Sequence, residues 1–289
     1  MLACDPAVLS AVWQAIEPII PTPVDNHPLG CHRRRVNNFV AFKGIIARIV
    51  TGCSWEVAGW AVGTSESTLL RRRSEWLRAG VFRHLAAMAL SGYDTMIGLQ
   101  LSRICIDTSQ HKAPMGGEGT GPSRVDRGKL GWKWSIATEA NGIPIAWIAA
   151  AGNVHDVKLV DDTIDVLDAR GYEVEVEEAH LDRGYDTVAV RAGFAEAGIE
   201  AHIVHRAAPQ LGRKARRRKS NPIPLGQRWG VERANSWLSN FGQLRRSTDR
   251  KPVHREAALD LAVALVLAVK LHKWNQRYGA TIYRPADTY

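Results

Sequence analysis

Short β-type runs between Leu101 and Arg206 restrict this chain to a fold built around a sheet. Three of them come first, SRICIDTS, GWKWSIATEA and PIAWIAAAG, and the last two flank Asn141-Gly142, a dipeptide typical of a hairpin turn. A fourth run ends at LDRGYD and a fifth is IEAHIVHR, with helical patterns over 156–169 and 187–198 before them. The order β-β-β-α-β-α-β predicts an α/β fold with a mixed five-stranded sheet flanked by helices, and two helices over about 228–246 and 253–275 close the chain.

A helical region precedes the sheet. Two short helices fit residues 55–62 and 66–79, with Gly63 in the turn between them and Thr64 or Ser65 as the cap of the second. This is the outline of a helix-turn-helix. We therefore divide the chain into a helical N-terminal DNA-binding region, 1–92, and a sheet domain, 93–289.

The second of these helices carries a run of three arginines. If the pair is a helix-turn-helix, the second helix would direct them toward DNA. The alternative is an ordinary helical hairpin with a solvated basic face. The predicted DNA contacts from this region are Arg71, Arg72 and Arg73.

Basic charge is concentrated near the C-terminus. Residues 201–248 contain nine arginines, two lysines and one acid, Glu232, whereas the whole chain has a net charge of +9 and a pI near 9.6. Clustered basic charge most often marks a nucleic-acid partner. The segment GRKARRRKSNPIPLG reads as an exposed basic loop, and its Arg216, Arg217 and Arg218 are predicted DNA contacts.

Several classes of protein are disfavoured by what the sequence contains. The four cysteines are scattered with no C-x-x-C pair, which indicates reduced thiols in a cytoplasm. The first residues do not resemble a signal peptide. The longest apolar stretch, 257–269, contains Asp260 and is too short to cross a bilayer. We expect a cytoplasmic protein without a membrane partner. His202 and His205 lie three residues apart in a strand and point to opposite faces, which disfavours a joint metal site.

Three carboxylates are the candidate catalytic residues. Asp107 ends the first predicted strand and Asp182 the fourth, at the edge where sites gather in open α/β sheets. Glu232 lies inside a helix, nearly opposite the apolar stripe of that helix. It either belongs to a solvated face and pairs with Arg228 one turn earlier, or faces a cleft. A DNA-binding surface gains nothing from an isolated acid, which favours the cleft.

Carboxylates that converge on a cleft favour a particular chemistry. Their oxygens bind hard divalent cations such as Mg²⁺. Two ions roughly 3.5–4 Å apart can stabilise both the attacking and the leaving oxygen of a phosphoryl displacement. We therefore expect two Mg²⁺ ions, with Mn²⁺ as a substitute, and arginines around them that hold the DNA backbone.

Five blocks of the sequence, taken together, resemble a known family. ICIDTSQHKAP, GEGTGPSRVDRGKLGWKWSI, GIPIAWIAAAGNVHD, LDRGYD and RWGVERANSWLSNFGQLRR are similar to the bacterial insertion-sequence DDE transposases of the IS-four/IS-five superfamily. The resemblance runs from about residue 30 to 275. It implies an RNase H-like catalytic domain behind a helical DNA-binding region. It also implies that Asp107, Asp182 and Glu232 are the metal ligands, with Arg228 and Tyr185 beside them.

The sequence departs from the family pattern around the glutamate. The pattern expects Tyr seven residues before Glu232 and Lys seven after it, where this chain has Leu225 and Ser239. Some related groups also lack these two residues. The remaining predicted DNA contacts are Arg228, Arg233, Arg245 and Arg246.

The resemblance implies a transposase. It would bind the terminal inverted repeats of its element, cut the 3′ ends by Mg²⁺-dependent hydrolysis and join them to target DNA. Double-stranded DNA is the expected partner, and we expect a homodimer on DNA because two ends must be brought together. Two alternatives stay open at this point: a DNA-binding protein without catalysis, and a metal-dependent nuclease of the same fold.

Overall fold

The computed structural model describes residues 2–22, 35–203 and 228–282 of the chain. They form two compact units. The helical unit comprises Met1–Gly98, His111–Gly119 and Trp237–Tyr289, and the sheet unit comprises Leu99–Gln110 and Thr120–Ser236. The sequence predicts one boundary, between residues 92 and 93, with all later residues in the sheet domain. The observed helical unit also contains the C-terminal helices, which pack with the N-terminal ones.

The sheet unit contains the predicted strands and one more. The strands are β1 Arg103–Lys112, β2 Gly121–Pro122, β3 Leu130–Glu139, β4 Pro144–Ala151, β5 Glu178–Leu181 and β6 Glu200–Ile203. The extra strand is β2, whose Gly121 and Pro122 pair with Gly131 and Leu130 of β3. The described strands are ordered β2-β3-β1-β5-β6, and β4 also pairs with β3. β1, β5 and β6 are parallel neighbours, and β3 and β4 are antiparallel.

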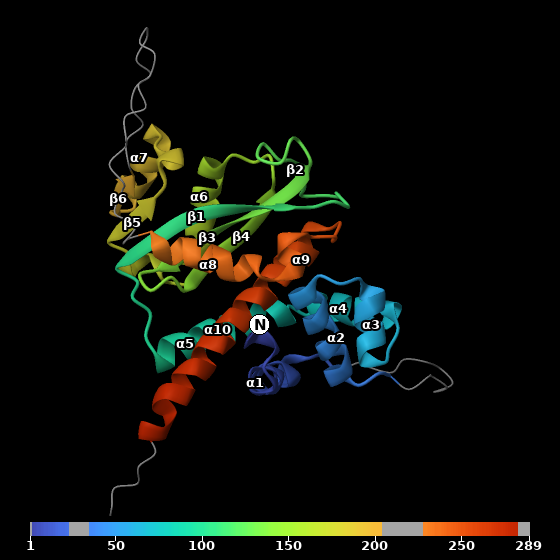
Figure 1. The fold of residues 1–289 in the computed structure, drawn as a ribbon. Coiled ribbons are helices and arrows are strands. Elements are labelled where there is room, and N and C mark those ends of the chain that lie inside the picture. The colour runs from blue at the N-terminus through green and yellow to red at the C-terminus, as the bar shows by residue number, and fades with distance from the viewer. Residues whose placement is uncertain (1, 23–34, 204–227, 283–289) are drawn as a thin grey trace, which may run out of the picture. The chain divides into compact units, whose positions relative to one another are not determined.

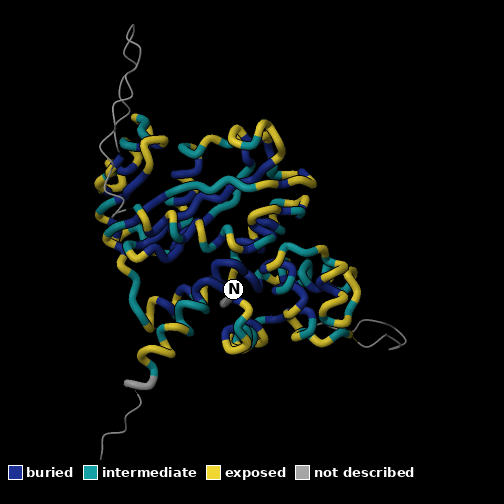
Figure 2. The backbone as a smooth tube through the Cα atoms, in the orientation of Figure 1, coloured by how far each residue is buried: buried dark blue, intermediate teal, exposed yellow. Residues whose placement is uncertain are grey.

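Helices cover both faces of this sheet (Figure 1). They are α6 Leu159–Asp168, α7 Val188–Glu196 and α8 Trp229–Ser239, with short 3₁₀ turns η3 Asp156–Lys158, η4 Glu173–Glu175 and η5 Arg183–Tyr185. Successive residues of β3 show the two faces. Ser135 accepts a hydrogen bond from Thr163 of α6 at 2.8 Å, and Trp134 donates one to Asn235 of α8 at 2.8 Å. β3 is therefore covered on both sides, and all its residues after Leu130 are buried (Figure 2). The mixed, helix-flanked sheet agrees with the RNase H-like fold expected from the resemblance.

The helical unit is built around one long C-terminal helix. Its helices are α1 Pro6–Ile16, α2 Asn38–Thr51, α3 Trp55–Val62, α4 Glu66–Arg78, α5 Val81–Met96, α9 Gly242–Arg245 and α10 Pro252–Ile282, with 3₁₀ turns η1 Leu2–Cys4 and η2 Glu17–Ile19. α10 packs against α5 and α1, and its apolar stretch, residues 257–267, is buried apart from Asp260. In the described part of the chain, no helix combines the length and the apolar character that crossing a membrane requires.

The predicted helix pair in the N-terminal region is confirmed. α3 spans 55–62 and α4 spans 66–78, and Ser65 caps α4 by accepting a hydrogen bond from the Thr68 backbone N–H at 3.3 Å. The helix predicted over 228–246 is instead divided into α8 and α9. α9 begins at Gly242, which lies close to Thr51 of α2. A Cβ at this position would lie 2.3 Å from the carbonyl oxygen of Thr51, so the close approach requires glycine.

Candidate active site

Two of the predicted acids are placed by adjacent parallel strands. Ile106 of β1 is in register with Leu181 of β5, so Asp107 and Asp182 come next on each strand. Asp107 is half-buried, whereas Asp182 is exposed and accepts a hydrogen bond from the Gly184 backbone N–H at 3.4 Å. The parallel register thus places Asp107 and Asp182 at neighbouring positions where the pairing of β1 with β5 ends. Asp107 itself lies inside β1, which continues to Lys112, and does not end its strand as predicted.

The third acid, Glu232, lies in the first turn of α8. The start of this helix is held against the β3–β4 turn. Arg233 donates a hydrogen bond to the carbonyl oxygen of Asn141, and a Cβ on Gly142 would lie 2.7 Å from the carbonyl oxygen of Gly230. Gly142 also has φ of +77°, a conformation that favours glycine. The turn predicted from Asn141-Gly142 therefore positions the helix that carries Glu232.

The electrostatics of Asp107 show that the three acids lie near one another. The pKa of Asp107 is raised from 3.8 to about 6, mainly by burial and in smaller part by the negative charges of Asp182 and Glu232. Arg228 and a hydrogen bond from the Thr108 backbone oppose this rise. The structure therefore brings together the three acids that sequence reasoning selected from three separate segments.

Asn235 connects the acid site to the core of the sheet unit, and sequence reasoning missed it. Its side chain is 8% exposed. Its Oδ1 accepts a hydrogen bond from Trp134 Nε1 at 2.8 Å, and its Nδ2 donates to Asp107 Oδ2 at 3.1 Å. The Trp134 bond fixes which end of the amide faces Asp107. The sequence signal that could have identified Asn235 is its position three residues after Glu232, which places both side chains on adjacent turns of one helix.

Arg228 and Tyr185 lie beside Asp107. Arg228 is half-buried, and its positive charge acts on Asp107 by lowering the pKa of that carboxyl group. Tyr185 is 3% exposed, and burial raises the pKa of its hydroxyl, with the Asp107 charge adding to the rise. Both residues thus occupy the neighbourhood of the acids, as the resemblance implied.

Arg72, one of the predicted DNA contacts, is a buried structural residue. Its side chain is 2% exposed, its Nη2 donates to the carbonyl oxygen of Val36 at 2.7 Å, and its Nη1 lies 3.6 Å from Glu75 Oε2. A guanidinium enclosed in this way has no face left for DNA. We therefore remove Arg72 from the predicted contacts.

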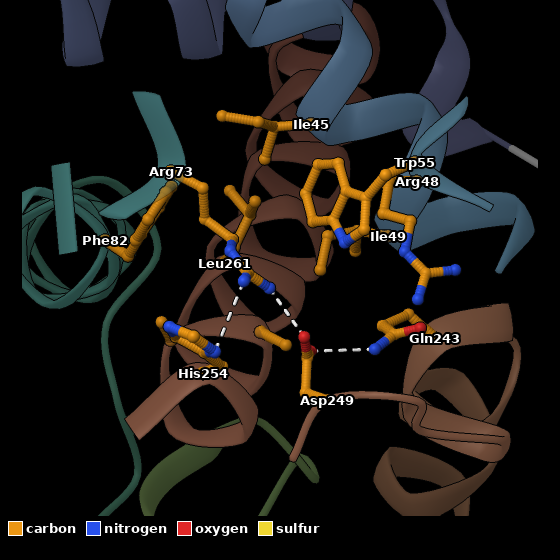
Figure 3. Close-up of a pocket in the computed structure, with 12 residues that line it drawn as sticks. Ile45, Arg48, Ile49, Trp55, Arg73, Phe82, Gln243, Asp249, His254 and Leu261 are labelled. Carbon is orange, nitrogen blue, oxygen red and sulfur yellow. Dashed lines mark hydrogen bonds and ion pairs between the residues drawn. The ribbon is translucent and has the colours of Figure 1, made fainter. Parts of the chain in front are cut away.

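Arg73 is also engaged inside the helical unit. It lines a pocket there, and its Nη1 lies 2.6 Å from Asp249 Oδ1 (Figure 3). The other Asp249 carboxylate oxygen accepts from Gln243 Nε2 at 2.8 Å. Arg73 holds α4 to the segment before α10, so we remove it from the contacts as well. Arg71, on the other side of α4, is exposed.

The remaining predicted arginines differ in their surroundings. Arg233 bonds Asn141 and its guanidinium carbon lies 3.8 Å from the centre of the Trp229 ring, which gives it a structural role. Arg245 and Arg246 are exposed at the end of α9. Arg216, Arg217 and Arg218 lie outside the described residues.

The family of the chain follows from comparison of its sequence with family models. Residues 99–267, which include all three acids, match the "Transposase DDE domain" family. Residues 9–86, which include α3 and α4, match the family described as "Putative transposase of IS4/5 family". The chain belongs to the DDE transposases. Within that class it belongs to the IS4/5 group, which confirms the family resemblance.

Two curated relatives come from Burkholderia cepacia. One, "Putative transposase for insertion sequence element IS402", is 32% identical over 194 residues, which cover 65% of this chain and 84% of the relative. The other, "Insertion element IS402 uncharacterized 16.2 kDa protein", is 28% identical over 117 residues, 40% of this chain and 80% of the relative. Among solved structures, the chain is similar to "Crystal structure of a pre-cleavage Mos1 transpososome" at 11% sequence identity. The match covers 86% of this chain and 82% of that chain, with a TM-score of 0.27.

Proposed function

We propose that this protein binds the terminal inverted repeats of its own insertion sequence, cleaves the 3′ ends and transfers them to target DNA. The observation that carries the proposal is the neighbourhood of Asp107 in β1, where the charges of Asp182, just after β5, and Glu232, in α8, both act on the Asp107 carboxyl group. Membership of the DDE transposases supports this reading.

The acid site suits divalent cations. Carboxylate oxygens are the ligands that Mg²⁺ prefers, with Mn²⁺ as an alternative. Burial, with a smaller contribution from the charges of Asp182 and Glu232, raises the pKa of Asp107, and a bound dication would oppose that effect. We propose two ions, held by Asp107, Asp182 and Glu232. When bound, they would lower the pKa of the attacking water and stabilise the departing oxyanion.

The neighbouring side chains would prepare the acids for this task. Asn235 holds one oxygen of Asp107 through its Nδ2, which would orient the carboxylate for a cation. Arg228 favours the ionised form of the same carboxyl group. The hydrogen bond from Gly184 orients Asp182. These contacts reduce the rearrangement needed before the reaction.

DNA would be held by exposed basic side chains. In the described residues, Arg71 on α4 and Arg245 and Arg246 after α9 are exposed and suited to phosphate contacts. We propose that the α3–α4 pair recognises the repeat as a helix-turn-helix, with α4 in the major groove. The two ends of an element must react together, so we propose a homodimer on DNA, in the cytoplasm.

The test uses purified protein and duplexes that carry the flanks of its own gene. We expect Mg²⁺-dependent cleavage at the 3′ ends of the repeats, followed by joining to a second duplex, and no cleavage of a shuffled duplex. An Asp182→Asn variant should bind the repeats and leave them uncut. Specific binding without cleavage would instead indicate a DNA-binding protein. Cleavage without joining would indicate a nuclease of the same fold.

A further inference from the structure

The two strands at one end of the described sheet carry the same four-residue pattern. β5 reads Glu-Ala-His-Leu and β6 reads Glu-Ala-His-Ile. They are parallel and in register, so that Glu178 lies beside Glu200 and His180 beside His202. Side chains two residues apart in a strand point to the same face. Two glutamates and two histidines therefore form a cluster on one face of the sheet unit.

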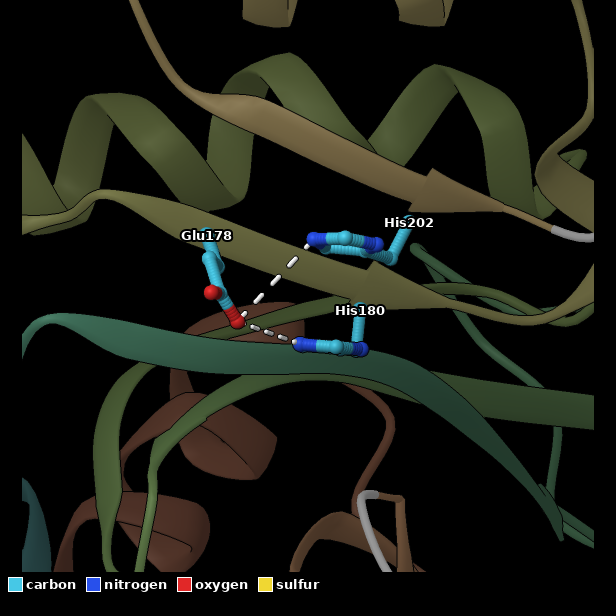
Figure 4. Close-up of side chains that lie close together, drawn as sticks. All are labelled: Glu178, His180 and His202. Atoms are coloured by element: carbon cyan, nitrogen blue, oxygen red, sulfur yellow. Dashed lines mark hydrogen bonds and ion pairs between the residues drawn. The ribbon is translucent and has the colours of Figure 1, made fainter. Parts of the chain in front are cut away.

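The potential ligand atoms of this cluster converge on one carboxylate oxygen (Figure 4). His180 Nε2 lies 3.1 Å and His202 Nε2 lies 3.9 Å from Glu178 Oε2. One ligand atom from each of the three residues lies within 4.8 Å of the others. The imidazole rings are stacked, with centres 4.6 Å apart and planes at 10°. Glu200 approaches from the other side, with Oε1 3.5 Å from His202 Nε2.

The charges in this cluster favour a cation. Carboxylates directly opposite each other on neighbouring strands repel, and Glu178 and Glu200 occupy such positions. The hydrogen bond between His180 and Glu178 partly offsets that repulsion, and both imidazoles supply nitrogen ligands. A bound dication would balance two carboxylates and use both imidazole nitrogens.

We propose that His180, His202 and Glu178 form a binding site for a divalent transition metal, with Glu200 as an additional oxygen ligand. Four-coordinate zinc has bonds of about 2.0–2.1 Å, so its ligand atoms lie about 3.3 Å apart. The distances of 3.1 and 3.9 Å in the cluster bracket that value. The imidazole rings are stacked nearly parallel, so metal binding would require the His202 ring to tilt toward the shared carboxylate oxygen. Imidazole nitrogen selects Zn²⁺ or a related ion over Mg²⁺.

This metal would join a terminal strand to its neighbour. β6 ends the strand order of the described sheet, and the metal would link it to β5 through side chains of both strands. β5 leads directly to Asp182, two residues after His180. The site is separate from the acids proposed for catalysis and does not depend on the proposed function. Its role would be to stabilise the strand pair that positions Asp182.

The test measures Zn²⁺ binding to the full chain without a histidine tag, by competition with a chelating dye. Millimolar Mg²⁺ is present to occupy the acid site. The variants are His202→Ala and Glu178→Gln, both at partly exposed side chains, and the matched control is His84→Ala, at an exposed histidine of α5. Circular dichroism and the thermal midpoint without metal report whether each variant folds.

We expect the wild type and His84→Ala to bind one Zn²⁺ per chain and to melt at a higher temperature with Zn²⁺. Replacement of outer contacts at metal sites weakens affinity by about 10–100-fold, so loss of a direct ligand in His202→Ala or Glu178→Gln should weaken it by at least about 10-fold. If His202→Ala does not fold, Glu178→Gln decides. The proposal is overturned if the folded variants bind Zn²⁺ as the wild type does, or if Mg²⁺ displaces the Zn²⁺.

Discussion

Replacement of Asp107 by asparagine should stabilise the metal-free protein at alkaline pH. The side chain keeps its shape, and its oxygen can still accept the hydrogen bond from Asn235. What is lost is a negative charge that burial and two neighbouring acids disfavour. A site prepared for a reaction often reduces the stability of the fold in this way.

The magnitude follows from the pKa of Asp107. It rises from 3.8 to about 6, a shift of about two units at about 1.4 kcal/mol each, which gives about 3 kcal/mol. Because the folded state holds the proton more tightly, this stabilisation is fully present below about pH 4 and is lost as the pH rises through about 6. Asp107→Asn should therefore exceed the wild type in stability by up to about 3 kcal/mol above that window.

The assay is denaturant unfolding of both proteins in EDTA, at several pH values from 4 to 8, with intrinsic tryptophan fluorescence as the readout. We expect the stability difference to grow between about pH 4 and 6 and then to remain constant. Added Mg²⁺ should stabilise the wild type more than the variant, because binding to the folded state alone raises its stability. An Asp107→Asn protein that is no more stable than the wild type at pH 8 would refute the reasoning.

Three further predictions concern single side chains. Asn235→Ala should reduce the free energy of unfolding by about 1–3 kcal/mol, because it leaves the Trp134 indole N–H buried without its acceptor. It should also slow cleavage, so denaturant unfolding and a cleavage assay are both measured. Arg72→Ala should reduce the free energy of unfolding by about 1–3 kcal/mol in denaturant unfolding. Arg71→Ala should leave that free energy within about 0.5 kcal/mol of the wild type and should weaken DNA binding, which fluorescence anisotropy measures. Gly142→Ala should destabilise the fold by about 1–3 kcal/mol, seen as a lower denaturation midpoint, because of its positive φ.

Contradictory results are defined for each of these variants. An Asn235→Ala protein with wild-type stability and cleavage would show that the amide does not position Asp107. Equal stability losses in the Arg71 and Arg72 variants would contradict their different burial. An unaffected Gly142→Ala protein would show that the turn tolerates a side chain.

Features determined by neighbouring residues were predictable from the sequence. The bounds of α3 are those predicted, and α4 ends one residue before its predicted end. Both helices were predictable because the capping serine and the glycine turn that define them lie within the segment itself. The hairpin at Asn141-Gly142 follows the same rule. The position of Asp182 just after a strand was also evident, because it follows a short β-type run. The prediction that Asp107 ends its strand was wrong, because β1 continues to Lys112.

Features that depend on distant partners were not predictable. The burial of Arg72 depends on its hydrogen bond to the carbonyl oxygen of Val36, which is 36 residues away in the sequence. Asn235 acquires its role from Trp134, 101 residues away. The sequence also gave no reason to place α10 with α5, because a buried apolar helix suits either part of the chain.

The histidines illustrate the same limit. Alternation within one strand disfavours a joint site for His202 and His205, and that prediction stays untested because His205 lies outside the described residues. The structure places His202 beside His180 instead, through the register of two strands. Register between parallel strands joined by a helix is set by packing, and no short motif encodes it.

The most direct test of the account is cleavage by a Glu232→Gln variant. Wild type and variant are mixed with a duplex that carries the gene's own flanks, and Mg²⁺-dependent cleavage and DNA binding are measured in parallel. The account predicts that the variant binds like the wild type and does not cleave, because Gln keeps the shape of the side chain and removes the charge that holds a cation. A variant that cleaves like the wild type would contradict it, since Glu232 would then be only a charge on an exposed helix face.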